Sequence, residues 1–221
     1  MKILLIDTCG AVGSVVLADT GTRAVVASVE MAGRTASERL IGVVRGLAER
    51  SGVELRELGA VVVVSGPGSF TGVRVGVSAA KGLCDALGVP IVAVSRLAVL
   101  TGLTPVSDGS VVALLDAGRG EFYCGEYLDG ECVREALLTR DELRALVGGE
   151  GAAVVVCEAG VAEAVAELRP RVVAEPLAGD ALALALCRIE RGEFDDLATV
   201  DANYVRRTDA EIFAKPAATA R

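Results

Sequence analysis

The sequence predicts an α/β fold in which one β-β-β-α-β-α unit occurs twice in tandem. β-rich runs at residues 14–18 and 24–30 are separated by a hairpin-length turn, which favours antiparallel neighbours. Four consecutive valines at 61–64 are typical of a central parallel strand that is buried on both faces. The strand that ends in Asp7 recurs in the second half as one that ends in Asp116.

The first half is expected to contain three strands, a helix, a strand, a second helix and a short strand. These elements are placed at residues 2–8, 14–18, 24–30, 37–51, 58–65, 71–87 and 90–94. A capping box at residues 35–38 begins the first helix, and Gly52 ends it. Ser69 or Thr71 caps the second.

The second half repeats this order. Its strands and helices are placed at residues 111–116, 121–128, 131–135, 141–147, 152–157, 161–168 and 180–191. Asp129-Gly130 is expected as a tight hairpin turn. Two such units describe duplicated ribonuclease-H-like lobes, the ASKHA architecture of actin, hexokinase and Hsp70. We therefore predict lobes at residues 1–106 and 107–221, with the tail from about residue 195 not placed.

Composition excludes several classes of function. The 221 residues include no histidine, which removes imidazole bases and histidine-ligated metal sites, and the six cysteines show no metal-ligand spacing. A net charge of −8 disfavours nucleic-acid binding by this chain alone. The apolar run at the start is cut off by Asp7, and no run is long enough to span a membrane. A soluble, cytoplasmic protein without a metal site of its own is expected.

A glycine-rich segment lies between the predicted strand at 58–65 and the following helix. It consists of Gly66, Pro67, Gly68, Ser69, Phe70, Thr71 and Gly72. Its backbone N–H groups would suit an anion, but no Lys-Ser or Lys-Thr pair follows as in a Walker loop. The other interpretation is a tight turn that needs a positive φ and close backbone approach. Both interpretations stay open at this point.

Small residues line two adjoining faces of the expected helix at 71–87. One face contains Gly72, Gly76 and Ala80, and the other contains Val75, Ala79 and Gly82. Glycine inside a helix costs about 1 kcal/mol relative to alanine, and close packing is the usual compensation. The second face, bordered by Arg39, Arg74 and Ser78, is a candidate surface for a partner's helices, and packing inside this chain is the alternative.

Asp7 and Asp116 are expected to end equivalent strands and to face a cleft between the halves. In this architecture such residues hold magnesium-nucleotide, which leaves an ATPase or phosphotransferase function open. No Lys or Arg follows Asp7 in the next turn to neutralise phosphates. Each residue is equally well explained as an aspartate that caps a turn.

The segment at 66–83, GPGSFTGVRVGVSAAKGL, resembles the hallmark segment of the TsaB (YeaZ) family. Four shorter matches accompany it in order along nearly the whole chain. They are residues 6–8 (Ile-Asp-Thr), 37–40 (Ser-Glu-Arg-Leu), 116–123 (Asp-Ala-Gly-Arg-Gly-Glu-Phe-Tyr) and 204–206 (Tyr-Val-Arg). Two positions depart from that pattern, because Ala36 stands where the family often has His, and Ala202 where Pro commonly precedes the final Tyr-x-Arg.

The resemblance implies a non-catalytic scaffold subunit of the bacterial machinery that makes threonylcarbamoyladenosine beside the anticodon of tRNAs reading ANN codons. Its partner TsaD carries the metal and transfers the threonylcarbamoyl group. TsaE is a further ATPase component, and TsaC-type enzymes supply the threonylcarbamoyl-adenylate. The first two helices are the implied contact with TsaD, and a similar surface supports a homodimer when TsaD is absent. The resemblance implies that this subunit reaches tRNA only through the complex.

Two further points follow from the resemblance. It implies no cofactor bound by this chain alone, and leaves open ATP or ADP at a subunit junction. It also carries an older assignment as a glycoprotease, against which the absence of histidine argues. A stand-alone ASKHA-type ATPase or phosphotransferase is the alternative function.

Overall fold

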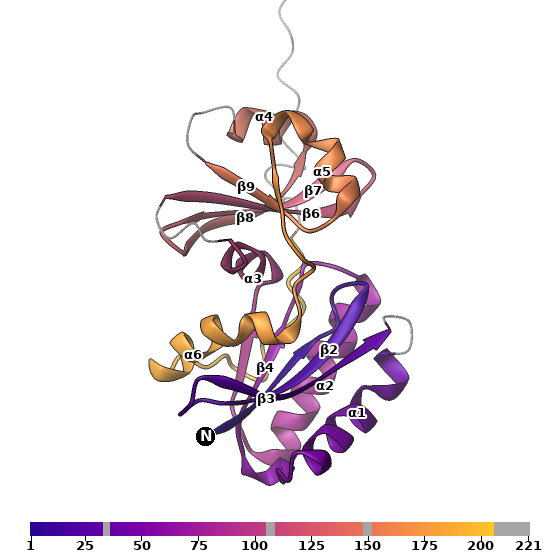
Figure 1. The fold of residues 1–221 in the computed structure, drawn as a ribbon, viewed down its shortest axis with the longest axis vertical. Coiled ribbons are helices and arrows are strands. Elements are labelled where there is room, and N and C mark those ends of the chain that lie inside the picture. Colours follow the sequence, from indigo (N-terminus) through magenta and orange to yellow (C-terminus); the bar gives the residue numbers. More distant parts are fainter. Residues whose placement is uncertain (33–35, 105–108, 148–151, 206–221) are drawn as a thin grey trace, which may run out of the picture.

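The computed structural model describes residues 1–32, 36–104, 109–147 and 152–205, with the backbone only for 36–38. Two lobes lie one above the other, each built on a five-stranded sheet (Figure 1). The first lobe begins with β1 (Lys2–Asp7), β2 (Val12–Asp19), β3 (Ala24–Ala32), α1 (Ala36–Arg50), the 3₁₀ helix η2 (Leu55–Glu57), β4 (Leu58–Val64), α2 (Phe70–Leu87) and β5 (Ile91–Val94).

The chain then enters the second lobe and finally returns to the first. The elements on this path are α3 (Arg96–Gly102), β6 (Ser110–Gly118), β7 (Glu121–Leu128), β8 (Glu131–Thr139), α4 (Arg140–Val147), β9 (Ala153–Val156), α5 (Ala159–Ala164), η3 (Ala166–Leu168), β10 (Arg171–Val172), η4 (Ala178–Ala181) and α6 (Leu182–Glu190).

Both sheets have the same topology. The first has the order β3-β2-β1-β4-β5, and the second has β8-β7-β6-β9-β10. In each, three strands form an antiparallel meander, and two more lie parallel on the far side of the first strand. Ile6 on β1 pairs with Val63 on β4, as Leu114 on β6 pairs with Val156 on β9. The predicted duplication of a ribonuclease-H-like lobe is confirmed.

Each sheet is covered on both faces. In the first lobe α1 and α2 pack side by side on one face, and η4 with α6 cover the other (Figure 1). In the second lobe neighbouring residues of one strand face different cores: Val112 and Leu114 face α4 and α5, whereas Val111 and Ala113 face α3. This double coverage explains why the central strands are continuous apolar runs.

The lobes exchange helices. The helix α3 follows β5 of the first lobe but packs on β6, β7 and β9 of the second. The segment of η4 and α6 follows β10 but belongs to the core of the first lobe, through Ala178, Ala181, Leu182, Ala185 and Leu186. The sequence repeat alone assigns these five residues to the second lobe. Hydrophobic periodicity predicts a helix, but it does not predict which sheet the helix covers.

Residues 191–205, here called the C-terminal strap, run along the first lobe after α6. The Asp195 N–H donates to Ile91 O at 3.0 Å, and the Lys81 ammonium donates to Val200 O at 2.8 Å. The Asn203 N–H then reaches Ser65 O at 2.7 Å, directly before the glycine-rich loop. These contacts place the tail as far as residue 205.

Several local expectations differ from the structure. The helix expected at 161–168 is split into α5 and η3, and the one expected at 180–191 begins as the 3₁₀ turn η4. The capping box at 35–38 lies outside the described side chains. The apolar segments around the six cysteines predict reduced, mostly buried thiols; all six are free, and Cys132 and Cys187 are exposed. Within the described residues, no helix has both the length and the apolar character that crossing a membrane requires.

Candidate functional site

A cleft of about 1030 Å³ opens between the lobes. The first lobe contributes the turn between β1 and β2, the glycine-rich loop and the start of α2, and the second lobe contributes the ends of β6 and β9. The lining residues are Thr8, Cys9, Gly10, Ala11, Ala32, Gly68, Ser69, Thr71, Gly72, Val75, Arg96, Asp116, Cys157, Glu158 and Glu175.

Asp7 lies at the end of β1, behind the cleft surface, and is 1% exposed. Its Oδ1 accepts the Cys9 N–H at 2.8 Å, whereas Oδ2 has no partner among the described residues. Burial raises the pKa of this carboxyl, and the nearby Arg96 opposes that rise. Asp7 thus holds the turn after β1 and presents no open carboxylate to the cleft.

Arg96 is the first residue of α3 and its side chain is 3% exposed. Its Nη2 donates to Glu175 Oε1 at 2.9 Å, and the same oxygen accepts the Ala11 N–H at 2.7 Å. Glu175 belongs to the connection between β10 and η4, so its carboxylate crosses the cleft to the β1–β2 turn. The three groups form a link between lobes, here called the Glu175 clasp (Ala11, Arg96 and Glu175).

Asp116 occupies on β6 the place that Asp7 has on β1, but it is exposed and lines the cleft. Its Oδ1 accepts the Gly118 N–H at 2.8 Å, and its own N–H donates to Glu158 Oε2 at 2.7 Å. Burial is the main cause that raises the pKa of Glu158, and the charges of Asp116 and Glu175 add to it. Both predicted aspartates therefore support turns at strand ends.

The glycines of the loop and of early α2 pack against the β1–β2 turn. A Cβ on Gly68 would lie 2.5 Å from the carbonyl oxygen of Cys9, and a Cβ on Gly72 would overlap the carbonyl oxygen of Thr8. The Thr8 hydroxyl in turn donates to Gly72 O at 2.6 Å. Gly66, before Pro67, has φ +103°, which a side chain rarely adopts. These contacts support the interpretation as a tight turn with close backbone approach.

The loop also starts α2. Ser69 is the N-cap residue, since its Oγ accepts the Gly72 N–H at 3.3 Å, and its own N–H donates to Cys9 O at 2.8 Å. Thr71, the other candidate cap, is exposed and lines the cleft.

The residues of this cleft do not fit a magnesium-nucleotide. Arg96 is the one basic side chain among the described lining residues, and it already pairs with Glu175. The acidic side chains there are Asp116, Glu158 and Glu175, which would repel phosphates. Within the described part of the chain, no three Cys, Asp or Glu side chains gather as metal ligands. The Ala11 N–H of the β1–β2 turn already donates to the Glu175 carboxylate.

The predicted partner surface is divided in the structure. Gly76 and Ala80 are buried against the sheet, so this face of α2 packs internally. On the adjoining face Gly82 is exposed with open space around it, whereas Val75 and Ala79 are half-buried and pack against the core. The flanking residues Arg39, Arg74 and Ser78 are all exposed.

An aromatic and cationic cluster joins the start of α2 to the strap. The Arg74 guanidinium lies 3.5 Å from the centre of the Phe70 ring, and its Nε donates to the Tyr204 hydroxyl. Phe70 is 58% exposed. The Tyr-x-Arg segment is therefore bound to the loop at its Tyr204.

Sequence reasoning missed Arg96, Glu158 and Glu175. Arg96 and Glu175 are 79 residues apart, and neither belongs to a motif. The one available signal for Arg96 was its position: it is a charged residue that only Ser95 separates from the apolar run expected as a strand at 90–94.

Comparisons with known proteins give one consistent result. Residues 28–210 match the family model described as TsaD: tRNA N6-adenosine threonylcarbamoyltransferase. The chain is 37% identical over 129 residues to the tRNA threonylcarbamoyladenosine biosynthesis protein TsaB of Escherichia coli, covering 58% of this chain and 55% of that protein. The TsaB of Bacillus subtilis is 35% identical over 127 residues, with the same coverage. The chain thus spans about half the length of these curated relatives.

Solved structures cover more of the chain. The structure described as YeaZ from Pseudomonas aeruginosa is 31% identical with a TM-score of 0.75, and covers 92% of this chain and 99% of that one. Another, described as an uncharacterized protein with similarity to peptidase YEAZ from the same organism, is 30% identical with a TM-score of 0.76. It covers 93% of this chain and 99% of that one.

Proposed function

Since the chain belongs to the TsaB (YeaZ) family, and to the wider tRNA N6-adenosine threonylcarbamoyltransferase family whose model it matches, we propose that it acts in the synthesis of threonylcarbamoyladenosine in tRNA. Its role is that of a non-catalytic subunit that binds and activates a TsaD-type transferase. In this proposal TsaE joins the larger complex, tRNA is reached only through it, and the chain forms a homodimer when TsaD is absent. A cytoplasmic protein is implied.

The observation that carries the proposal is the outer surface of the α1–α2 pair. Gly42 on α1 and Gly82 on α2 are exposed, and a Cβ at either would meet nothing within 4 Å. Ile41, beside Gly42, is an apolar side chain that is 47% exposed. Small residues let a second pair of helices approach closely, and an exposed isoleucine gains by burial in such a contact. Flanking arginines would set its register more than its affinity.

The cleft supports a non-catalytic role. A phosphotransferase needs cations near the phosphates, and Arg96 is already paired with Glu175. The net charge of −8 favours tRNA contact through partners. Nucleotide at the junction with TsaD remains part of the proposal, because the partner would supply the missing cations.

Co-purification with the cognate TsaD, followed by a tRNA modification assay with and without this chain, tests the proposal. We expect a stable complex and modification that depends on this chain. The alternative, a stand-alone ATPase, predicts turnover by the chain alone. Magnesium-dependent ATP hydrolysis of about 1 s⁻¹ that Asp7→Ala abolishes would overturn the non-catalytic role, since such a rate is that of an ordinary enzyme.

The partner surface is tested by a large residue at an open position. Ala79→Trp is a poor probe, because Ala79 packs against the core and overpacking would strain the monomer as well. Gly82→Trp places the indole in open space, so we expect a folded monomer that no longer self-associates or binds TsaD. Glu163→Trp, on the exposed side of α5, is the matched control. Size-exclusion chromatography that shows unchanged association of Gly82→Trp would refute this surface.

A further inference from the structure

The Glu175 clasp has the geometry of a bound oxyanion. One carboxylate oxygen of Glu175, Oε1, accepts two hydrogen bonds: from the Ala11 N–H at 2.7 Å and from Arg96 Nη2 at 2.9 Å. A backbone N–H together with a guanidinium is the donor set with which proteins hold carboxylate and phosphate groups. Here the anion is a side chain of the same polypeptide.

The turn is shaped for this close approach. A Cβ on Gly10 would overlap Glu175 Oε1 and would lie 2.6 Å from Arg96 Nη2. Glycine at this position leaves free the space in which the oxygen meets the Ala11 N–H and the guanidinium together. The space beside Gly10 is therefore a receptacle for an oxyanion.

The donors of this receptacle are not fully used. Arg96 is buried, with 3% of its side chain exposed, and its Nε has no hydrogen-bond partner among the described residues. A buried guanidinium with an unpaired N–H carries a desolvation cost that a second acceptor oxygen would remove. Glu175 contributes one oxygen to both bonds, so an anion with several oxygens would offer the guanidinium further acceptors.

The position of Glu175 in the fold allows its carboxylate to move away from the Ala11 N–H and Arg96. Its side chain is 32% exposed, and it belongs to the irregular connection between β10 and η4. Displacing the carboxylate toward solvent would break no strand or helix. The cleft, at about 1030 Å³, is large enough for an incoming anion once the Glu175 side chain has turned out toward solvent.

We propose that the Ala11 N–H, Gly10 and Arg96 form an oxyanion-binding site whose resident ligand is Glu175, and that a phosphate-bearing molecule enters it only when Glu175 is displaced. In the resting protein the carboxylate closes the cleft to phosphate and ties the β1–β2 turn to the connection between the lobes. This assignment concerns the chain itself and does not rest on its proposed role beside TsaD.

Isothermal titration with inorganic phosphate tests the site, in wild type, Glu175→Ala and Glu158→Ala. Glu158→Ala is the matched control, because it removes the same charge from the same cleft, and Glu158 bonds to the Asp116 N–H rather than to Ala11 or Arg96. We expect phosphate to bind Glu175→Ala at least about tenfold more tightly than wild type, and the control to resemble wild type. No gain, or an equal gain in both variants, would overturn the proposal.

A second measurement locates the binding. Phosphate added to Glu175→Ala should shift the amide resonance of Ala11 in an NMR spectrum, and shifts confined to other residues would refute the assignment. Acetate in place of phosphate separates a general oxyanion site from one that prefers phosphate. If Glu175→Ala fails to fold, Glu175→Gln takes its place, since its amide oxygen still accepts the Ala11 N–H but opposes phosphate with no charge.

Discussion

Glycines of α2 and its preceding loop differ in what surrounds them, although the sequence shows them as one pattern. Gly68, Gly72 and Gly76 all lie against the β1–β2 turn, where a methyl group would overlap Thr8 or Cys9. Gly82, further along α2, has nothing within 4 Å of a built Cβ. The first three therefore permit packing inside the lobe, while the fourth leaves an open place on the surface.

Alanine at two of these positions should have opposite effects. Gly72→Ala forces the carbonyl of Thr8 to move, so we expect a loss of about 1–3 kcal/mol in the free energy of unfolding. Gly82→Ala removes a flexible residue from an exposed position on α2 and should raise the free energy of unfolding by up to about 1 kcal/mol. Urea unfolding followed by circular dichroism measures both. Equal destabilisation by the two variants would contradict the packing described here.

At the scale of elements, sequence periodicity predicted most strands and helices close to their bounds. The expected helix at 71–87 is α2 (Phe70–Leu87), and the valine run at 61–64 is the C-terminal part of β4. Among the strands and α-helices, two escaped because their signals are weak: β10 has only two residues, and α3 is a seven-residue helix that begins two residues after a strand ends. Which sheet a helix covers also escaped, since apolar spacing carries no information about its distant partner.

Long-range polar contacts were likewise beyond sequence reasoning. The repeat located Asp7 and Asp116, because each ends a strand of the same pattern. It did not locate Arg96 or Glu175, because these two residues form their ion pair only when the fold brings them together. Isolated charged residues are usually solvated. The chain has 22 basic and 30 acidic residues, and nothing in the sequence distinguishes Arg96 or Glu175 from the others.

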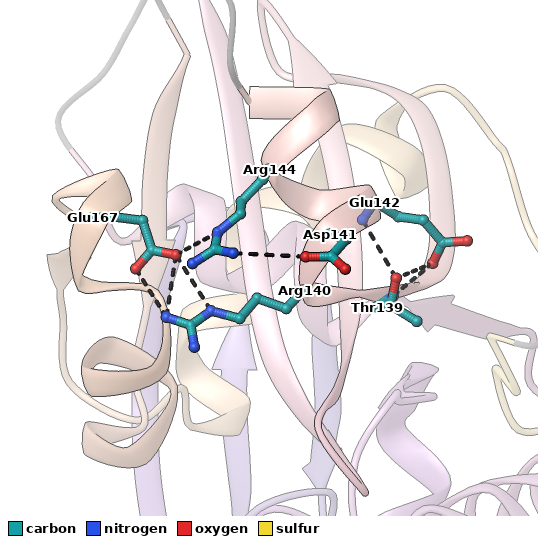
Figure 2. Close-up of polar contacts among 6 residues, drawn as sticks. All are labelled: Thr139, Arg140, Asp141, Glu142, Arg144 and Glu167. Atoms are coloured by element: carbon teal, nitrogen blue, oxygen red, sulfur yellow. Dashed lines mark hydrogen bonds and ion pairs between the residues drawn. The ribbon is translucent and has the colours of Figure 1, made fainter.

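An ion-pair cluster joins α4 to η3 at the outer end of the second lobe (Figure 1). Glu167 of η3 accepts from Arg140 and Arg144, both on α4, at 3.1 Å and 2.9 Å (Figure 2). Asp141 also lies 3.6 Å from Arg144, and the hydroxyl and N–H of Thr139 donate to Glu142 beside it. Hydrogen bonds from Arg140 lead the causes that lower the pKa of Glu167 to about 2.

This cluster predicts a pH dependence of stability. A carboxyl whose folded pKa is lowered stabilises the protein above its unfolded value, near 4.5, and loses that contribution as the pH falls toward about 2. The difference in unfolding free energy between wild type and Glu167→Gln should therefore be largest above pH 5 and vanish near pH 2. It should also shrink in about 1 M salt, because the pairs are exposed.

Urea unfolding at a series of pH values measures this difference, and Glu163→Gln is the control. Glu163 is an exposed glutamate on the neighbouring α5. A difference for Glu167→Gln that stays constant between pH 2 and 6 would show that the cluster does not stabilise the packing of α4.

For the whole molecule, Glu135 on β8 joins three parts of the chain. Its Oε1 accepts from the Tyr127 hydroxyl at 2.6 Å and from the hydroxyl of Ser95, the N-cap residue of α3. Its Oε2 accepts from the Asn203 amide of the C-terminal strap at 2.7 Å. One carboxylate of the second lobe thus holds both the connection into that lobe and the strap that lies on the first.

Glu135→Ala should therefore loosen the junction between the lobes. The buried Tyr127 hydroxyl loses its acceptor, so we expect a loss of roughly 1–3 kcal/mol in unfolding free energy. Hydrogen exchange should also quicken at the Asn203 N–H, which bonds to Ser65. Glu131→Ala, an exposed position on the same strand, is the control. Unchanged exchange at Asn203 would show that the strap is held without Glu135.

The exchange of helices between the lobes makes a prediction about which parts of the chain fold alone. Residues 1–95 lack η4 and α6, so one face of their sheet would be bare, and a sheet with an uncovered apolar face does not form a stable domain. We expect this fragment to aggregate or to give poorly dispersed NMR signals. Joining it through a short Gly/Ser linker to residues 174–205 restores the missing cover. The linker has to span no more than two extended side chains, because Arg96 Nη2 and Glu175 Oε1, next to the two ends, are 2.9 Å apart.

The joined chain should unfold cooperatively in urea, with a dispersed NMR spectrum, as expected of an independent domain. Residues 96–172, which contain α3 and the second sheet, form the complementary test and should also fold alone. A control that joins residues 1–95 to a scrambled 174–205 of the same composition separates specific packing from added length. If residues 1–95 fold as well alone as when joined to 174–205, then α6 is dispensable and the lobes are divided where the repeat predicts, near residue 106.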